Sequence, residues 1–460
     1  MKIEQIYTGC LAEAAYYIES DGEAAIIDPL RETAPYTERA DSDGAKIKYI
    51  LETHFHADFV SGHVDLAKKT GATIVYGPTA KANFDFHEAT DGEILQLGKV
   101  KIKVLHTPGH TMESASFLLL DENDQPHALF SGDTLFINEV GRPDLAVSTE
   151  TSREDLAGYL YSSLREKIIP LPDHVIVYPG HGAGSACGKN IGKESSDTLG
   201  RQKETNYALR PELTKEQFVD EVLNGILPPP QYFPKNAMLN KSGYVSFDEV
   251  LEQGTKGLEL AAFQSKMANG ALVLDTRDKG EFAKGHIPGS MFIGIDGSFA
   301  PWVGIMIEDL KREIILVADE GREEEVVTRL SRVGYDNAQG FLIGGFEAWK
   351  AAGNKVTMVK QVAPSDLSEM KDLPIIDLRR FSEFNGGHLE GALNYPLDFI
   401  YENLGKLDKS QAYLVHCKGG YRSMVGASVM MAAGFENVSD IMGGWDAISK
   451  TDPKSRPELA

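Results

Sequence analysis

Short apolar runs alternate with segments of helical periodicity over roughly the first 240 residues. Ala24–Asp28 (AAIID) and Ile47–Leu51 (IKYIL) are dominated by apolar residues, which indicates buried strands. Val100–Val104 (VKIKV) alternates apolar and polar residues and predicts a half-exposed strand. Helical patterns lie between these strands, as in residues 62–70 and 153–166. Strands that alternate with helices predict a layered α/β domain.

A proline-dense stretch, Leu227–Pro234 (LPPPQYFP), follows this pattern. Proline continues neither helices nor central strands, so we place the end of the first domain at residue 241. The remaining chain contains an internal repeat. LVLDTRDKGEFAKGHIPG begins at Leu272, and PIIDLRRFSEFNGGHLEG begins at Pro374. A second pair of similar blocks begins at Gly334 and Gly434 in the same order. The repeat predicts two copies of one small domain, at residues 242–358 and 359–460.

Composition narrows the possible partners and the compartment. The chain has 460 residues, a formal net charge of −22 and a pI of about 5.0. So acidic a surface repels phosphate backbones, which excludes nucleic acid as an expected partner. Cys10, Cys187 and Cys417 are far apart and odd in number, which favours free thiols in a reducing cytoplasm. No signal-like N-terminus and no apolar run of about 18 residues occurs, so neither secretion nor a membrane span is expected.

Four loops that follow predicted strands contain histidine or aspartate. Thr53–Phe59 reads THFHADF, and residues 106–110 read HTPGH. Residues 131–134 read SGDT and residues 178–181 read YPGH. Loops that end strands converge at one edge of a sheet, where α/β proteins place their sites. The pattern therefore predicts a metal centre that draws on His54, His56, Asp58, His110, Asp133 and His181.

These motifs resemble the metallo-β-lactamase superfamily over about residues 1–240. The resemblance implies an αββα sandwich for the first domain. In dinuclear members of that superfamily the HxHxD element continues into a further histidine that holds a second metal. This sequence has Phe59 there, and a phenyl ring offers no lone pair, so a single metal site is expected.

Two imidazoles and one carboxylate with open positions are the ligand set of non-haem Fe(II) oxygenases. By analogy with the persulfide dioxygenase branch of the superfamily, His54, His110 and Asp133 would hold one Fe(II) per chain. His56, Asp58 and His181 would then orient these ligands by hydrogen bonds. The alternative is zinc with His56 as an added ligand, activating water for hydrolysis. Imidazole suits both metals, so the ligands alone leave both open.

The glycine-rich segment after His181 adds candidate substrate contacts. Lys189 could meet an anionic thiol, and Cys187 could relay a sulfane sulfur or be an inert small residue. Arg142 could line the pocket or have a structural role. Cys10 lies among apolar residues and is expected in the core.

The second copy of the repeat contains Val415–Ser423 (VHCKGGYRS) between an apolar strand and a helical run. Backbone N–H groups and the positive end of a helix surround such a cysteine and stabilise a thiolate or persulfide. Lys418 and Arg422 add positive charge. This loop and the flanking motifs resemble the rhodanese family, α/β domains with a central parallel sheet. The resemblance implies that Cys417 carries sulfane sulfur. In the first copy Asp319 falls at the place of Cys417, so a degenerate domain without catalysis is expected.

Together these features predict a cytoplasmic persulfide dioxygenase with sulfurtransferase activity. Its substrates would be a low-molecular-weight thiol persulfide, O2 and sulfite, and the product thiosulfate. A dimer or tetramer of identical chains is expected by the same resemblance. Two alternatives remain: a zinc-dependent hydrolase of glyoxalase II type with a sulfurtransferase appendage, and a non-catalytic sulfur carrier. The sequence leaves open whether the thiol is glutathione, coenzyme A, bacillithiol or cysteine.

Overall fold

The computed structural model describes residues 1–451 and 458. The chain divides into two compact units, one formed by residues 1–247 with 331–334 and the other by residues 248–330 with 335–460. The end of the predicted third domain, residues 452–457 and 459–460, lies outside the described residues. Pro234 stands in the first turn of a helix that belongs to the first unit, which is one of the few helical positions that accept proline. The predicted domain limits stay predictions.

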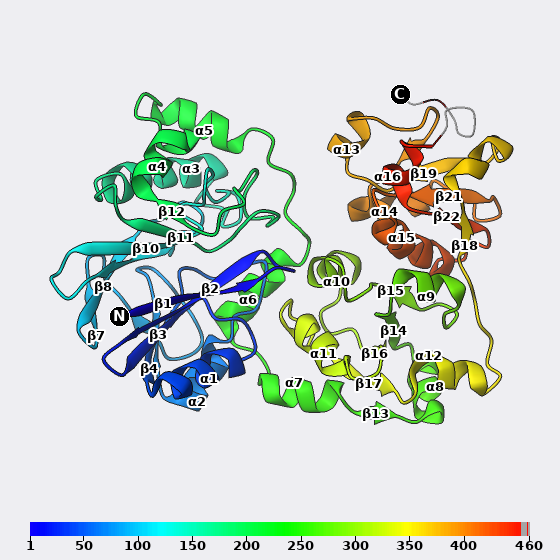
Figure 1. Ribbon diagram of the computed structural model, residues 1–460, viewed down its shortest axis with the longest axis horizontal. Coiled ribbons are helices and arrows are strands. Elements are labelled where there is room, and N and C mark those ends of the chain that lie inside the picture. Colours follow the sequence, from blue (N-terminus) through cyan, green and yellow to red (C-terminus); the bar gives the residue numbers. More distant parts are fainter. Residues whose placement is uncertain (452–457, 459–460) are drawn as a thin grey trace. The chain divides into compact units, whose positions relative to one another are not determined.

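The first unit contains two six-stranded sheets (Figure 1). The first sheet has the order β1 (Lys2–Thr8), β2 (Glu13–Ser20), β3 (Glu23–Ile27), β4 (Lys46–Leu51), β5 (Thr73–Tyr76), β6 (His87–Glu88). The second sheet has the order β12 (Asp197–Thr198), β11 (Ile176–Pro179), β10 (Pro126–Gly132), β9 (Ala115–Leu120), β8 (Val100–His106), β7 (Ile94–Leu97).

The helices up to residue 168 lie between strands, as the periodicity predicted, and the helices from residue 199 onward follow the last strand of this unit. They are α1 (Ala34–Asp43), α2 (His63–Thr70), α3 (Arg153–Ser163), a π-helical turn (Leu164–Ile168), α4 (Leu199–Thr205), a 3-10 turn (Tyr207–Leu209), α5 (Lys215–Leu223) and α6 (Phe233–Ser242). Helix α7 (Phe247–Gly254) begins at the last residue of this unit. A capping box formed by Ser152 and Asp155 starts α3, because these side chains satisfy backbone N–H groups that the first turn leaves free.

Three apolar cores define the layers of the first unit. One core includes Tyr16 and Phe117 and fills the space between the two sheets. A second includes Tyr17 and Leu66 and packs α1 and α2 on the outer face of the first sheet. A third includes Leu160 and packs α3 and α5 on the outer face of the second sheet (Figure 1). The order helix, sheet, sheet, helix confirms the expected αββα sandwich.

Parallel pairing brings the carboxyl ends of several strands to common edges. β3 pairs in parallel with β4, so Ile27 lies opposite Leu51. β10 pairs in parallel with β11, so Gly132 lies opposite Pro179. The residues that follow these strands, and the loop after β8, carry the candidate metal ligands.

The second unit contains two five-stranded sheets in which every strand pair is parallel. The first has the order β13 (Gly257–Leu258), β17 (Ala338–Leu342), β16 (Ile314–Val317), β14 (Leu272–Asp275), β15 (Met291–Phe292). The second has the order β18 (Lys360–Val362), β22 (Val438–Ile441), β21 (Tyr413–His416), β19 (Ile375–Asp377), β20 (Leu393–Asn394). The two orders are the same, which confirms that the sequence repeat encodes one fold twice.

The helices of the two copies also correspond in their order along the chain. The first copy contains α8 (Leu260–Ala268), α9 (Lys279–Lys284), α10 (Phe299–Met306), α11 (Glu323–Ser331) and α12 (Gly345–Ala351). The second contains 3-10 turns at Pro364–Glu369 and Leu397–Phe399 and the helices α13 (Phe381–Asn385), α14 (Ile400–Leu404), α15 (Tyr421–Ala432) and α16 (Gly444–Ile448). Within residues 1–451 and 458, no helix combines the length and the apolar composition that a membrane span requires.

Candidate metal centre and cysteine loop

His54, His110 and Asp133 lie together in the first unit, with ligand atoms within 4.8 Å of one another. The Nε2 atoms of His54 and His110 are 3.9 Å and 3.4 Å from Asp133 Oδ2. All three side chains are buried, and neither His54 Nε2 nor Asp133 Oδ2 has a hydrogen-bond partner among the described residues. Buried polar atoms without partners are costly. A divalent cation between these atoms would remove that cost, so the residues present fit a metal ion.

Hydrogen bonds turn the Nε2 lone pairs of both histidines toward Asp133. Thr53 Oγ1 donates to the Asp28 carboxylate at 2.8 Å, so it must accept from His54 Nδ1 at 3.0 Å. His110 Nδ1 lies 2.9 Å from the backbone carbonyl of Arg142, which can only accept. Burial, and next the nearby His56, lower the pKa of His54, and burial lowers the pKa of His110. Both rings are thus held neutral, the form that binds metals.

Asp133 is held by a chain of hydrogen bonds on its other oxygen. His181 Nδ1 lies 2.9 Å from Asp133 Oδ1, and His181 Nε2 lies 2.8 Å from Asp58 Oδ2. Burial opposes a charge on His181, but the two carboxylates outweigh it and raise the pKa of His181. Burial likewise opposes a charge on Asp133, but His181 and His110 outweigh it and lower the pKa of Asp133. Both ring nitrogens of His181 are engaged in hydrogen bonds to carboxylates, so neither offers a lone pair to a metal. His181 and Asp58 are therefore suited to orient Asp133.

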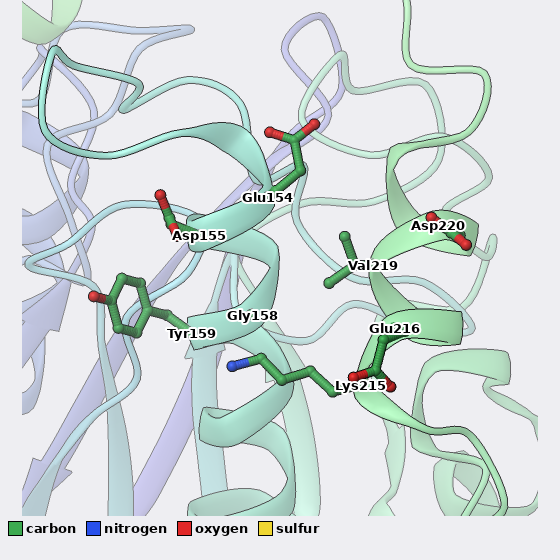
Figure 2. A pocket seen from close by; sticks show the side chains of 8 residues that line it. All are labelled: Glu154, Asp155, Gly158, Tyr159, Lys215, Glu216, Val219 and Asp220. Atoms are coloured by element: carbon green, nitrogen blue, oxygen red, sulfur yellow. The ribbon is translucent and has the colours of Figure 1, made fainter.

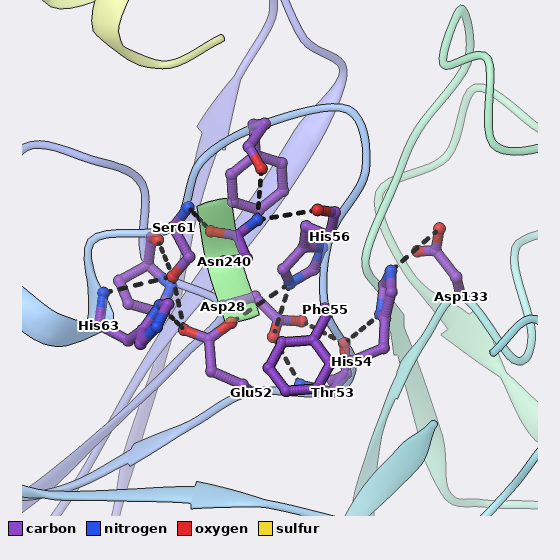
Figure 3. Close-up of polar contacts among 12 residues, drawn as sticks. Asp28, Glu52, Thr53, His54, Phe55, His56, Ser61, His63, Asp133 and Asn240 are labelled. Carbon is purple, nitrogen blue, oxygen red and sulfur yellow. Dashed lines mark hydrogen bonds and ion pairs between the residues drawn. The ribbon is translucent and has the colours of Figure 1, made fainter. Parts of the chain in front are cut away.

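His56 points away from this cluster, as Figure 3 shows. Its Nε2 is 3.1 Å from Asp28 Oδ1 and 3.6 Å from Glu52 Oε2. Its ring stacks on Phe59, with the ring centres 4.2 Å apart. Phe59 is completely buried. The geometry therefore favours a cluster of three donors over the alternative in which His56 is a fourth.

Sequence reasoning missed the residues that fix the loop of His54 and His56. Asn240 of α6 donates to the carbonyls of His56 and Phe59, both at 2.8 Å, and accepts from the Ser61 N–H at 2.9 Å (Figure 3). Asp28 is the last residue of the predicted strand and directly follows β3, a position that could have marked it. No local pattern marks Asn240, because it meets the loop only through tertiary packing.

Cys187 lies beside the metal cluster. It is buried, and its sulfur lies within 4.8 Å of a ligand atom of Asp58 and of a ligand atom of His181. Burial, and next the charge of Asp58, raise the pKa of the Cys187 thiol well above its usual value. A protonated thiol is a poor nucleophile, so a relay role requires another group to take its proton. That role stays a prediction.

Arg142 and Lys189 are engaged in contacts that fix loops. Arg142 forms a two-point ion pair with Asp144 at 2.6 and 2.8 Å and donates to the carbonyl of Leu227 at 2.6 Å. Its backbone N–H donates to the carbonyl of Cys187 at 2.9 Å. Lys189 donates to the carbonyls of Glu221 and Asn224 at the end of α5. The predicted contacts of these cations with an anionic substrate stay predictions.

A groove of about 450 Å³ lies between α3 and α5 (Figure 2). Its lining residues are Glu154, Asp155, Gly158, Tyr159, Lys215, Glu216, Val219 and Asp220. It contains none of the predicted site residues. Its four carboxylates would repel an anionic thiol.

Cys417 lies between β21 and α15 and is buried. The Gly420 N–H donates to Cys417 Sγ at 3.2 Å. The Ser423 hydroxyl lies 3.6 Å from the sulfur and donates at 2.6 Å to Asp440 Oδ1. The first turn of α15 contains no acidic residue, so the positive end of this helix is available to a sulfur anion.

The predicted cations of this loop differ in their surroundings. Arg422 forms a two-point ion pair with Glu383 at 2.6 and 2.8 Å, so a carboxylate already balances its charge. Lys418 is exposed to solvent. Their roles around a persulfide on Cys417 stay predictions.

The strand register corrects the predicted alignment of the two copies. Asp275 pairs with Val317, and Asp377 pairs with His416. Ala318, and not Asp319, therefore stands where Cys417 stands at the strand end. The loop before the helix covers residues 318–322 in the first copy and 417–420 in the second, so the first is one residue longer. That extra residue shifted the sequence alignment by one position. Neither Ala318 nor Asp319 is a cysteine, so the first copy lacks the cysteine in either alignment.

Comparisons with known proteins agree with both parts of this description. Residues 8–181 match the Metallo-beta-lactamase superfamily, and residues 259–352 and 363–451 match the Rhodanese-like domain. A probable hydroxyacylglutathione hydrolase of Schizosaccharomyces pombe is 32% identical over 38% of this chain and 66% of its own length. The human mitochondrial persulfide dioxygenase ETHE1 is also 32% identical, over 45% of this chain and 74% of its own length. The solved structure of a metallo-beta-lactamase from Staphylococcus aureus is 34% identical and covers 74% of this chain and 98% of its own, with a TM-score of 0.65.

Proposed function

We propose that this chain, which belongs to the metallo-β-lactamase superfamily and carries two rhodanese-like domains, oxidises low-molecular-weight thiol persulfides at a single iron ion. The observation that carries the proposal is the cluster of His54, His110 and Asp133, three buried donors whose ligand atoms lie within 4.8 Å of one another. Two imidazoles and one carboxylate leave coordination positions open for substrate and O2. The similarity to a persulfide dioxygenase supports the same chemistry.

The proposed overall reaction is R–S–SH + O2 + H2O → R–SH + SO3²⁻ + 2 H⁺. Bound iron would supply the electron exchange that lets O2 react with sulfur. The chain itself binds and orients. Thr53 and the Arg142 carbonyl direct the two imidazoles. His181 steadies Asp133 through one oxygen and leaves the other free.

The second proposed step takes place at Cys417. Its thiolate would accept a sulfane sulfur from a second persulfide and release the thiol. Sulfite would then attack that outer sulfur, forming the S–S bond of thiosulfate. The bond to Cys417 Sγ would break, and its electron pair would return to Sγ as a thiolate. One chain would thus turn two persulfide molecules into one thiosulfate.

A zinc-dependent thioester hydrolase is the second candidate. It is favoured by one observation: hydroxyacylglutathione hydrolases match the first unit at the same identity as the persulfide dioxygenase. The orientation of His56 toward Asp28 and the engagement of both nitrogens of His181 favour the oxygenase over a dinuclear hydrolase.

The test is purification under anaerobic conditions, metal analysis, and O2 uptake with persulfides of glutathione, coenzyme A, bacillithiol and cysteine. We expect one iron per chain and stoichiometric O2 consumption and sulfite release. The variant His110→Ala should lower O2 uptake at least about a hundredfold. Removing a group that only orients a metal ligand already lowers activity by up to about a hundredfold, and removing the ligand itself should cost no less. The exposed His87, changed to Ala, is the matched control. Two zinc ions per chain with thioester hydrolysis and no O2 uptake would replace this proposal by the hydrolase.

A further inference from the structure

One lysine of the first rhodanese-like domain lies on the cysteine loop of the second. Lys279, the first residue of α9, is half-buried, and its Nζ donates to the carbonyl oxygen of Gly419 at 2.7 Å. A Cβ atom added to Gly420 would lie 3.3 Å from the same Nζ. The ammonium group therefore lies against the peptide that joins Gly419 to Gly420.

The other end of that same peptide contacts the sulfur of Cys417. Its N–H, on Gly420, donates to Cys417 Sγ at 3.2 Å. The C=O and N–H of a peptide form one resonance-coupled dipole. A cation on the oxygen polarises this dipole and makes the N–H a stronger donor. Lys279 is thus connected to the reacting sulfur through a single peptide group.

Contacts around the loop hold this arrangement. The Tyr421 hydroxyl donates to the Gly294 carbonyl of the first copy at 2.7 Å. The Phe292 N–H donates to Ser428 Oγ of α15 at 3.0 Å. A Cβ atom added to Gly297 would lie 2.2 Å from the Tyr421 ring, so this close approach requires glycine. The start of α15 is therefore fixed against the domain that provides Lys279.

Lys279 also carries a positive charge in this region, and this charge acts on Asp440, where it lowers the pKa of the carboxyl against the rise that burial causes. Arg422 is paired with Glu383, and Lys418 is exposed. Among residues 1–451 and 458, no carboxylate lies within ion-pair distance of Lys279 Nζ.

The other titratable groups near the sulfur are a carboxyl and an imidazole. Asp440 is bonded to the Ser423 hydroxyl. His416 Nε2 lies 3.6 Å from Asp377 Oδ2, and burial lowers the pKa of His416. Because the imidazole of His416 is neutral, Lys279 is the group that can stabilise a sulfur anion through the Gly419–Gly420 peptide.

We propose that Lys279 is a positioning residue for sulfur transfer, acting through the Gly419–Gly420 peptide to stabilise the anionic sulfur on Cys417. The inference rests on the proposed sulfur transfer at Cys417. The first copy, which has lost the cysteine itself, would then supply part of the active site of the second. In the transfer to sulfite, the negative charge returns to Cys417 Sγ when its bond to the outer sulfur breaks, and the polarised N–H stabilises this leaving thiolate.

The experiment compares the full chain with its Lys279→Met, Lys279→Arg and Lys284→Met variants. Lys284 is the matched control, because it lies on the same helix but pairs with Glu281 on the surface. Two quantities are measured by mass spectrometry of the Cys417 peptide: sulfur loading from thiosulfate, and the pH dependence of alkylation by iodoacetamide. We expect Lys279→Met to slow loading about three- to tenfold and to move the alkylation midpoint to higher pH, since a charge-assisted contact is lost. Lys279→Arg should restore most of both, and Lys284→Met should change neither.

An unchanged alkylation midpoint in Lys279→Met, with or without slower loading, overturns the inference, because a purely structural loss would not act on the sulfur anion. If the unmodified chain gains no sulfur on Cys417 at all, the proposed sulfur transfer fails instead. Loading of the unmodified chain thus separates the two failures.

Discussion

The two rhodanese-like domains share the same contacts around one buried arginine. In the first, Arg277 Nη2 donates to Asp275 at 2.6 Å and to the Gly285 carbonyl at 2.9 Å. In the second, Arg379 Nη2 donates to Asp377 at 2.6 Å and to the Gly387 carbonyl at 2.8 Å. Each guanidinium also lies 4.3 Å from the centre of an aromatic ring, Phe346 or Trp445. The repeated D-x-R and G-H motifs therefore hold the fold and do not by themselves mark activity.

The two domains differ where chemistry would take place. Cys417 is replaced by Ala318 at the strand end. The first turn of α15 begins with Tyr421, Arg422 and Ser423, whereas that of α11 contains Glu323, Glu324 and Glu325. Three carboxylates in the first turn of a helix would repel a sulfur anion at its positive end.

The strand beside the loop differs as well. Phe341 pairs with Leu316 in the first copy, and Asp440 pairs with Val415 at the matching position of the second. A domain can thus keep its core while the residues at its strand ends change, because these residues carry little of the packing.

The largest expected effect follows from removing the sulfur of the second copy. The variant Cys417→Ser should lower thiosulfate formation at least about a hundredfold, because a hydroxyl cannot carry sulfane sulfur. Sulfite release from a persulfide should continue. Both products are measured in one assay by chromatography. Cys10→Ser is the control, and normal thiosulfate output from Cys417→Ser would refute the assignment.

The shared scaffold predicts equal losses of stability in the two copies. Changing either Arg277 or Arg379 to Ala leaves a buried carboxylate unpaired, which costs about 3–5 kcal/mol. Hydrogen exchange at β14 and β19 should report a similar loss in each domain. A large loss in only one domain would show that the scaffolds are not equivalent.

Asp440, which stands where the first copy has Phe341, predicts an effect of pH on stability. Burial raises the pKa of Asp440 to about 6 from an ordinary value of 3.8, against the hydrogen bonds from Ser423 and Gln361. The folded state therefore holds the proton more tightly than the unfolded state. The resulting stability is complete below about pH 4 and is lost as the pH rises to about 6, by up to about 3 kcal/mol.

The variant Asp440→Asn should remove this decline, measured as the difference from the unmodified chain in urea unfolding at several pH values. The exposed Glu436, changed to Gln, is the control. Equal slopes for Asp440→Asn and the unmodified chain would mean that Asp440 does not carry a raised pKa.

The smallest expected effect is that of restoring a cysteine to the first copy. Ala318→Cys, introduced into the Cys417→Ser chain, should gain no sulfur from thiosulfate, because the loop is one residue longer and the helix begins with three glutamates. Mass spectrometry of the Ala318 peptide measures this. Loading at that cysteine would show that the cysteine alone separates the two domains.

Local patterns in the sequence were sufficient for much of this description. Apolar runs and helical periodicity predicted β3, β4, β8, α2 and α3, because a strand or helix encodes its period in neighbouring residues. The repeat predicted two copies of one fold. The loops after predicted strands identified His54, His110 and Asp133 as neighbours in space. The strands before them, β4 in one sheet and β8 and β10 in the other, end at the same edge of the sandwich.

Other features were decided by the tertiary structure alone. Asn240 reaches the loop of His56 from a helix about 180 residues away, and the Arg142 carbonyl orients His110. The one-residue shift from Asp319 to Ala318 became visible only in the strand register. Lys279 meets the cysteine loop only because the two copies pack together. Such contacts join residues that no short period relates, so they depend on how whole elements pack and not on the residues beside them.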